Sequence, residues 1–181
     1  MKKSEKNIIL GVTASIAIYK SCELIRRLKE CGFIVTVVMT QEAEELIKPA
    51  LFQGLSGRRV YRAGIFDASD TWDIEHISLA QKADLILIAP ATANIIAKLA
   101  SGICDDLLSC TVCASKAKVL IAPAMNENMY QNKITQSNIA KLKSCGYKFI
   151  APSKGLLACG VVGVGCLAET AEIVKEVKKL L

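Results

Sequence analysis

Short runs of apolar residues alternate with amphipathic segments along the first half of the chain. Residues 7–12, 33–39 and 84–89 are rich in Ile, Val and Leu, a composition typical of strands buried on both faces of a sheet. Between the first two runs, residues 16–30 place apolar side chains at helical spacing, and Gly32 follows as a helix-ending residue. The chain is therefore predicted to open as strand, helix, strand.

The alternation continues towards the C-terminus, with one break over residues 48–72. Pro49 and several glycines fall in this segment, and we expect it to be irregular, with a short strand near Val60. Further helices are predicted over 95–101, 107–114, 135–145 and 169–181, and further strands over 118–122 and 147–150. This order predicts one α/β domain over residues 1–181: a three-layer Rossmann-like (flavodoxin-like) fold, with a parallel sheet and helices on both of its faces.

Small and hydroxyl-bearing residues gather directly after the predicted strands. They are found at residues 13–15, at Thr40, over 90–94 and over 123–130, where Pro123 is expected to end the strand because it cannot continue a hydrogen-bonded ladder. Ligands of open α/β sheets bind at the carboxyl ends of the strands, so these segments are expected to converge on one site. Ser15 can donate to a phosphate and Asn126 can both donate and accept, although each can also serve as a plain helix cap.

Two further features carry candidate chemistry. His76 is the only histidine, and its side-chain type has an ordinary pKa suited to proton transfer near neutral pH. Residues 154–166 contain four glycines, with Cys159 among them, and indicate a lid that closes over a substrate. The alternatives are a structural histidine and a glycine-rich surface loop.

Composition and charge narrow the class of protein. The net charge is +6, but the basic residues are scattered and form no stripe with aromatic residues, so nucleic-acid binding is not expected. No apolar run reaches the roughly 18 residues that a membrane span needs, and residues 8–18 lack a signal-peptide cleavage site. We therefore expect a cytoplasmic protein, no membrane partner and reduced cysteines. Cys110 and Cys113 have metal-ligand spacing, with Cys104 nearby, but nothing completes a closed site, and no metal is predicted.

Taken together, four motifs resemble those of the homo-oligomeric flavin-containing cysteine decarboxylases over nearly the whole chain. Residues 11–20 (GVTASIAIYK) are similar to the first flavin-phosphate turn of that family, 90–95 (PATANI) to its Pro-Ala-Ser-Ala-Asn-Thr motif, and 123–130 (PAMNENMY) to its Pro-x-Met-Asn-x-x-Met-aromatic motif. His76 stands where the family has its active-site histidine. The chain departs from the family pattern at Ile95, in place of a threonine, and at Asp106, in place of an asparagine.

A fifth motif separates two branches of this family. Residues 157–160 (LACG), together with Gly163 and Gly165, resemble the substrate clamp of the phosphopantothenoylcysteine decarboxylases. The lantibiotic peptidyl-cysteine decarboxylases share the other motifs. The chain carries no ligase domain of the kind fused to many bacterial relatives, so a separate ligase is expected to act upstream.

The resemblance implies a cofactor, FMN, and a set of site residues. The residues implied to bind FMN are Gly11, Thr13, Ser15, Thr40, Thr92, Ala93, Asn94, Ile95 and Ala124. Those implied to bind substrate are Met125, Asn126, Ala158 and Gly160. By the same resemblance, His76 is a base or proton relay, Asn126 holds the substrate carboxylate and Cys159 donates the final proton.

The implied reaction is the decarboxylation of 4'-phosphopantothenoylcysteine to 4'-phosphopantetheine in coenzyme A biosynthesis. The cysteine thiol is oxidised to a thioaldehyde, CO2 leaves and the enethiolate is reduced again. Trimers, or dodecamers built from them, are also implied, with His76 supplied by a neighbouring subunit. The alternatives are a peptidyl-cysteine decarboxylase, a non-catalytic flavoprotein that regulates a phosphatase, and a flavin prenyltransferase.

Overall fold

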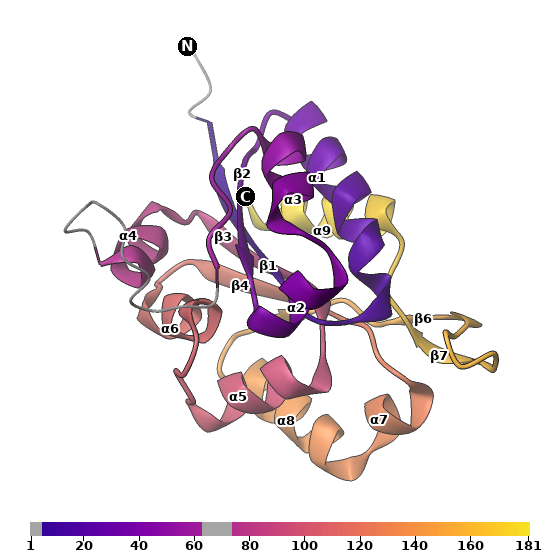
Figure 1. The fold of residues 1–181 in the computed structure, drawn as a ribbon. Helices are drawn as coiled ribbons and strands as arrows, with labels where there is room; N and C mark the ends of the chain where they lie inside the picture. The colour runs from indigo at the N-terminus through magenta and orange to yellow at the C-terminus, as the bar shows by residue number, and fades with distance from the viewer. Residues whose placement is uncertain (1–4, 63–73) are drawn as a thin grey trace.

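A parallel sheet forms the centre of the molecule in the computed structural model, which describes residues 5–62 and 74–181. Its strand order is β2-β1-β3-β4-β5 (Figure 1). The strands are β1 (Asn7–Val12), β2 (Ile34–Met39), β3 (Leu85–Ala91), β4 (Lys118–Pro123) and β5 (Lys148–Phe149). After β1, the chain adds β2 on one side of it and β3 on the other, so the order in which strands are added reverses at β1. A crevice is expected outside the carboxyl ends of β1 and β3, which lie side by side at this point.

Helices cover both faces of the sheet (Figure 1). One face packs against α1 (Lys20–Glu30), α3 (Pro49–Ser56) and α9 (Thr170–Leu180). The other face packs against α4 (Glu75–Lys82), α5 (Ala93–Ser101), α6 (Leu107–Ala114) and α8 (Lys133–Ser144). The side chains of β3 alternate between two apolar clusters: Leu85 and Leu87 face the first group of helices, and Ile86 and Ile88 face the second. Burial on both faces explains the continuous apolar runs and confirms the predicted three-layer α/β fold.

Four short elements complete the described part of the chain, and all four lie near the carboxyl ends of the strands. They are the 3-10 helix η1 (Ile16–Tyr19), α2 (Gln41–Leu46), α7 (Glu127–Gln131) and a hairpin of β6 (Ser153–Leu156) and β7 (Val162–Cys166). The hairpin is antiparallel and forms a separate two-stranded sheet that projects from the body of the molecule near α7 (Figure 1).

The segment expected to be irregular contains a helix, so that part of the prediction is wrong. Pro49 is the first residue of α3, and Gly57 ends the helix in the left-handed conformation with φ 70°. Both residues were interpreted as helix breakers, but they stand at the two positions where proline and glycine favour helix ends. Beyond it, Tyr61 pairs with Val38 as an isolated parallel bridge, close to the short strand expected near Val60. The rest of the predicted irregular segment, over residues 63–72, lies outside the described residues.

Two predicted boundaries also differ. The segment 16–30 divides into η1 and α1. Pro123 does end β4, as expected, but as its last residue and so one position later than predicted: it pairs with Ala91 after a register shift between Ile88 and Ala91, where a missing N–H is tolerated. Within residues 5–62 and 74–181, no helix is both long enough and apolar enough to cross a membrane.

Candidate functional site

A cleft of about 770 Å³ lies at the carboxyl ends of β1, β3 and β4, and we call it the strand-end cleft. It is lined by four parts of the chain: the first turn with η1, the start of α5, the segment 124–126, and the β6–β7 hairpin. Three of the four segments predicted to converge, 13–15, 90–94 and 123–130, contribute to it, whereas Thr40 does not line it. The volume falls within the roughly 300–1,000 Å³ of pockets that hold small molecules and cofactors.

Thr13 fixes two of these strand ends against each other. Its hydroxyl donates to the carbonyl oxygen of Pro90 over 2.7 Å and accepts from the backbone N–H of Thr92 over 3.1 Å. The side chain is 1% exposed and does not line the cleft. Ser21 adds a second link, donating to the carbonyl of Ala89 over 3.0 Å. Thr13 therefore positions the turns that form the cleft, rather than facing a ligand within it.

Ser15 and Thr92 place hydroxyl groups on the cleft wall. Ser15 caps η1 by accepting from the N–H of Ala17 over 3.4 Å, and Thr92 caps α5 by accepting from the N–H of Ile95 over 3.3 Å. Each hydroxyl uses an oxygen lone pair for the cap, so its hydrogen can still donate to an oxygen of a bound ligand. Two hydroxyl donors at the starts of helices suit a phosphate-bearing ligand.

Asn126 and Cys159 meet across the cleft. The Asn126 side-chain amide donates to the Cys159 Sγ over 3.6 Å, while its Oδ1 accepts from the N–H of Asn128 over 2.9 Å and caps α7. Cys159 lies in the turn between β6 and β7, which is closed by a hydrogen bond from the Gly160 N–H to the Leu157 carbonyl over 2.9 Å. The structure thus brings together a thiol and an amide that are distant in the sequence.

The hairpin is attached to the Asn126 segment at two glycines. The Met125 N–H donates to the Gly165 carbonyl over 3.0 Å, and a Cβ added at Gly165 would lie 2.0 Å from the Met125 carbonyl oxygen. The Val164 N–H donates to Glu127 Oε1 over 2.9 Å, and a Cβ at Gly163 would lie 2.6 Å from Glu127 Oε2. These glycines were interpreted as hinges, but here they permit close approach. Only Gly160, with φ 81°, needs the left-handed conformation in the hairpin turn.

The remaining residues implied by the resemblance divide into two groups. Those that line the cleft are Ala93, Ala124, Met125, Ala158 and Gly160. Those that do not line it are Gly11, Thr40, Asn94 and Ile95. Gly11 lies in β1, where an added Cβ would approach Leu108 Cδ1 to 2.6 Å, and Ile95 is a core residue, 2% exposed.

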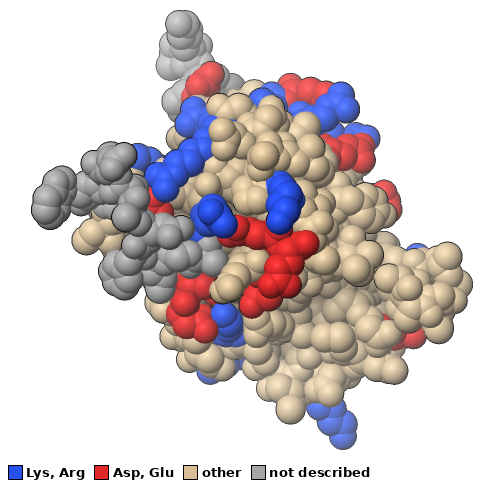
Figure 2. Space-filling view, in the orientation of Figure 1, with Lys and Arg blue, Asp and Glu red and all other residues tan. Residues whose placement is uncertain are grey.

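The sequence interpretation missed residues that also line the cleft. Tyr19 and Met129 line it and are 61% and 49% exposed, and Lys20, which also lines it, pairs with Glu169 over 3.3 Å. The available indication was their position inside two of the motifs, since Tyr19 and Lys20 fall within 11–20 and Met129 within 123–130. The surface over the hairpin and α7 carries few charged side chains (Figure 2).

His76 lies apart from the strand-end cleft, in the first turn of α4. Its Nδ1 is buried and has no hydrogen-bond partner among the described residues. Ile74 and Ile77 beside it are 60% and 38% exposed. Within one chain, the structure does not bring His76 together with Asn126 and Cys159.

Asp106, one of the two departures from the family pattern, has a structural explanation. It caps α6 by accepting from the Ser109 N–H over 2.8 Å and pairs with Lys98 over 2.9 Å. Nearby, burial and the neighbouring Cys113 thiol raise the pKa of Cys104 to about 11. Among residues 5–62 and 74–181, no group of three His, Cys, Asp or Glu side chains is placed to hold a metal.

Comparisons with known proteins agree with this geometry. A model of the flavoprotein family matches residues 1–181. The chain is 44% identical to a probable phosphopantothenoylcysteine decarboxylase of Streptococcus mutans, over 97% of this chain and 99% of the relative. It is 47% identical to the coenzyme A biosynthesis bifunctional protein CoaBC of Bacillus subtilis, over 97% of this chain but only 43% of that relative.

Solved structures extend the likeness to the fold. A PPC decarboxylase mutant complexed with pantothenoylaminoethenethiol superposes with a TM-score of 0.86 at 29% identity, covering 97% of each chain. The FMN-dependent cysteine decarboxylase SpaF superposes with a TM-score of 0.83 at 27% identity, covering 98% of each chain. With a family model matched over its full length and a relative of nearly equal length at 44% identity, this chain belongs to the flavoprotein family.

Proposed function

We propose that this protein is an FMN-dependent phosphopantothenoylcysteine decarboxylase that produces phosphopantetheine for coenzyme A biosynthesis. The observation that carries the proposal is the contact of Asn126 with Cys159 across the strand-end cleft, over 3.6 Å. The kinship with the Streptococcus mutans decarboxylase, which has nearly the same length, supports it. So does the structural likeness to a PPC decarboxylase mutant complexed with pantothenoylaminoethenethiol.

The cleft fits FMN in size and in chemistry. Ser15 and Thr92 would donate to the phosphate group, and the apolar wall near Ala93 and Ala124 would lie along the flavin ring. Gly11, Thr13, Thr40, Asn94 and Ile95 would act through the shape of the turns rather than through their side chains. The chemistry that bound FMN supplies is reversible acceptance of two electrons, which gives the substrate a thioaldehyde that can take up the electrons released with CO2.

The residues of this chain would bind the substrate and control its protons. The Asn126 amide, held in place by its cap of α7, would donate to the substrate carboxylate before CO2 leaves. Ala158 and Gly160 beside Cys159 would cover the reacting carbon and exclude water from it. Cys159 would then donate the proton that completes the thiol product.

His76 would act as base or proton relay on a substrate bound to a neighbouring subunit. A buried Nδ1 without a described partner, beside exposed Ile74 and Ile77, is the arrangement expected where another subunit covers a surface. The exposed Leu156, Val161 and Val162 of the hairpin offer a second apolar surface. We propose a homotrimer, or a dodecamer of trimers, located in the cytoplasm and fed by a separate ligase.

The direct test is to purify the protein, record its absorption spectrum and analyse the product by mass spectrometry. A yellow protein that converts phosphopantothenoylcysteine to phosphopantetheine and CO2 is expected.

In Cys159→Ser, CO2 release should persist while an oxidised enethiol product accumulates, because the final proton is missing. Cys145→Ser, at an exposed cysteine that does not line the cleft, is the matched control and should give the normal product. A colourless protein that refuses FMN would refute the proposal.

Shared sites can be tested by mixing two inactive variants. Coexpressed His76→Asn and Asn126→Ala chains should regain activity at about one quarter of the sites, because each interface combines residues from two subunits. No recovery in a mixed oligomer would refute a shared site without refuting the reaction.

A peptidyl-cysteine decarboxylase is the second candidate, favoured by the likeness to an EpiD mutant complexed with the substrate peptide DSYTC, with a TM-score of 0.83 at 25% identity. A peptide with a C-terminal cysteine, offered in place of phosphopantothenoylcysteine, separates the two functions. Turnover of the peptide alone would favour this second candidate.

A further inference from the structure

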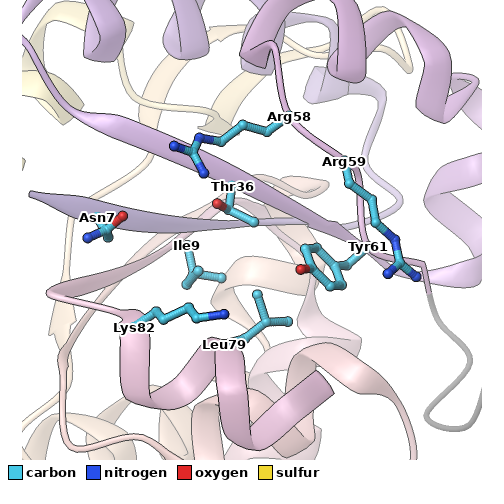
Figure 3. Close-up of a pocket in the computed structure, with 8 residues that line it drawn as sticks. All are labelled: Asn7, Ile9, Thr36, Arg58, Arg59, Tyr61, Leu79 and Lys82. Carbon is cyan, nitrogen blue, oxygen red and sulfur yellow. The ribbon is translucent and has the colours of Figure 1, made fainter. Parts of the chain in front are cut away.

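A second cavity, of about 210 Å³, lies on the sheet face covered by α4 (Figure 3). Ile9 of β1 and Thr36 of β2, which are partners in the sheet register, form its floor, and Leu79 of α4 forms a wall. None of its residues lines the strand-end cleft. We call it the cationic pocket, because Arg58, Arg59 and Lys82 also line it.

Two of these cations are not neutralised by the part of the chain that the structure describes. Neither the Arg58 guanidinium nor the Lys82 ammonium has an ion pair or a hydrogen bond there, and they approach the cavity from opposite sides (Figure 3). Arg59, in contrast, already has partners: its Nη2 lies 2.7 Å from Glu75 Oε1, and its Cζ lies 4.9 Å from the centre of the Tyr61 ring. The pocket therefore presents two uncompensated positive charges.

Two acidic groups near the pocket, among residues 5–62 and 74–181, are already paired. Glu75 is held by Arg59, as described above. Asp84 accepts from the Lys6 ammonium and from the Asn7 N–H, both over 2.8 Å. Both carboxylates are therefore bound to groups other than Arg58 and Lys82, which are left to attract a ligand of opposite charge.

Neutral donors complete the lining. The side chains of Asn7, Thr36 and Tyr61 border the cavity and have no hydrogen-bond partner in residues 5–62 and 74–181. Thr36 places a hydroxyl on a sheet face that is otherwise apolar nearby: Val38, two residues along the same strand and on the same face, is fully buried. An amide and two hydroxyls between two cations can bind several oxygens of one anion at once.

We propose that the cationic pocket binds a small phosphorylated anion. A tetrahedral phosphate presents oxygens in several directions, which suits donors that converge from β1, β2, α4 and the segment after α3. The cavity is smaller than the roughly 300–1,000 Å³ typical of sites for whole cofactors, so the phosphate or diphosphate group itself would occupy it. This site is separate from the one in which decarboxylation is proposed, and it does not depend on that function.

Calorimetric titration of the FMN-loaded protein with inorganic pyrophosphate tests the proposal. The Arg58→Gln, Lys82→Gln double variant should bind pyrophosphate at least about tenfold more weakly, because two charge-assisted hydrogen bonds are lost. Lys175→Gln is the matched control: Lys175 is an exposed lysine of α9, on the opposite face of the sheet, and its removal should leave binding unchanged. Running the titration with inorganic phosphate as well shows whether one phosphate group suffices.

Two results would overturn the site. Equal affinity in the double variant and the wild type would place any pyrophosphate elsewhere, and the absence of pyrophosphate binding to the FMN-loaded wild type would show that the pocket takes no such anion. Thr36→Val offers a second readout, because it keeps the charge and the shape of the floor while removing one donor. It should weaken binding by about three- to tenfold and leave the flavin spectrum unchanged.

Discussion

The strand-end cleft and the cationic pocket differ in the polar groups that line them. Among the described residues, the strand-end cleft has one lysine in its lining, Lys20, and this side chain is paired with Glu169. Its other polar side chains are the capping hydroxyls of Ser15 and Thr92, the Asn126 amide, the Tyr19 hydroxyl and the thiols of Cys159 and Cys166, and none of them carries a charge of its own. The cationic pocket instead combines free charges with unused donors on a small apolar floor. We therefore expect the strand-end cleft to select a large ligand by shape and fixed dipoles, and the cationic pocket to select a small anion by charge. Added salt should strongly weaken binding only in the cationic pocket.

The largest effect is expected from His76→Asn. CO2 release should fall by roughly 10²–10⁴-fold, the usual contribution of an active-site acid or base, while FMN stays bound. Pyrophosphate binding should be unchanged, because His76 does not line the cationic pocket. Stopped-flow detection of CO2 and the flavin spectrum measure the two outcomes. Gln81→Ala, an exposed change on the same helix, is the control. Normal turnover in the His76 variant would contradict the proposed role.

Gly165→Val should disturb the strand-end cleft by a steric clash, and Gly165 does not line the cationic pocket. A side chain at this position would meet the Met125 carbonyl oxygen, so β7 must move away from the Asn126 segment. We expect a loss of roughly 1–3 kcal/mol in the free energy of unfolding, together with weaker FMN binding. Urea denaturation and flavin titration are the measurements. Gly54→Ala, in α3 with no atom within 4 Å of the added Cβ, should cost nothing.

A smaller effect is expected at Asp84, beside the cationic pocket. Hydrogen bonds from Lys6 and the Asn7 N–H lower the pKa of Asp84 below its ordinary value. A carboxyl whose pKa is lowered by folding contributes stability above its unfolded pKa, and that contribution is lost as pH falls through the folded pKa. Asp84→Asn should therefore destabilise the protein by about 1 kcal/mol at pH 7, and the difference should vanish in acid. A difference that persists at pH 2 would contradict this assignment.

The smallest effect concerns Cys104, on the sheet face that carries the cationic pocket. Although Cys104 is exposed, local desolvation and the neighbouring Cys113 thiol raise the pKa of Cys104 to about 11, so its alkylation by iodoacetamide should be slow at pH 8 and should accelerate up to about pH 11. A thiol whose pKa is raised by folding ionises more readily in the unfolded chain than in the folded protein. The free energy of unfolding should therefore decrease by a small amount as the pH rises above the ordinary thiol pKa of 9.0. Mass spectrometry of the alkylated peptide over a pH series checks the first expectation.

The sequence predicted the sheet and the convergence of its strand ends, because buried parallel strands produce continuous apolar runs that few other structures share. It failed at α3, where Pro49 and Gly57 punctuate a helix as readily as they break one. It could not tell that Gly163 and Gly165 serve close contact, because a glycine says nothing about which atoms lie opposite it. The cationic pocket escaped notice for a similar reason: Arg58 and Lys82 are far apart in the chain and resemble ordinary surface charges.

The attachment of β7 to the segment 125–127 limits how the active site can open. Two hydrogen bonds, Met125 to Gly165 and Val164 to Glu127, join the base of the hairpin to the turn that carries Asn126. The hairpin cannot swing out as a rigid flap without breaking both. Substrate entry and product escape are therefore expected to depend on bending of the outer loop around Cys159, with the thiol travelling while its amide partner stays still.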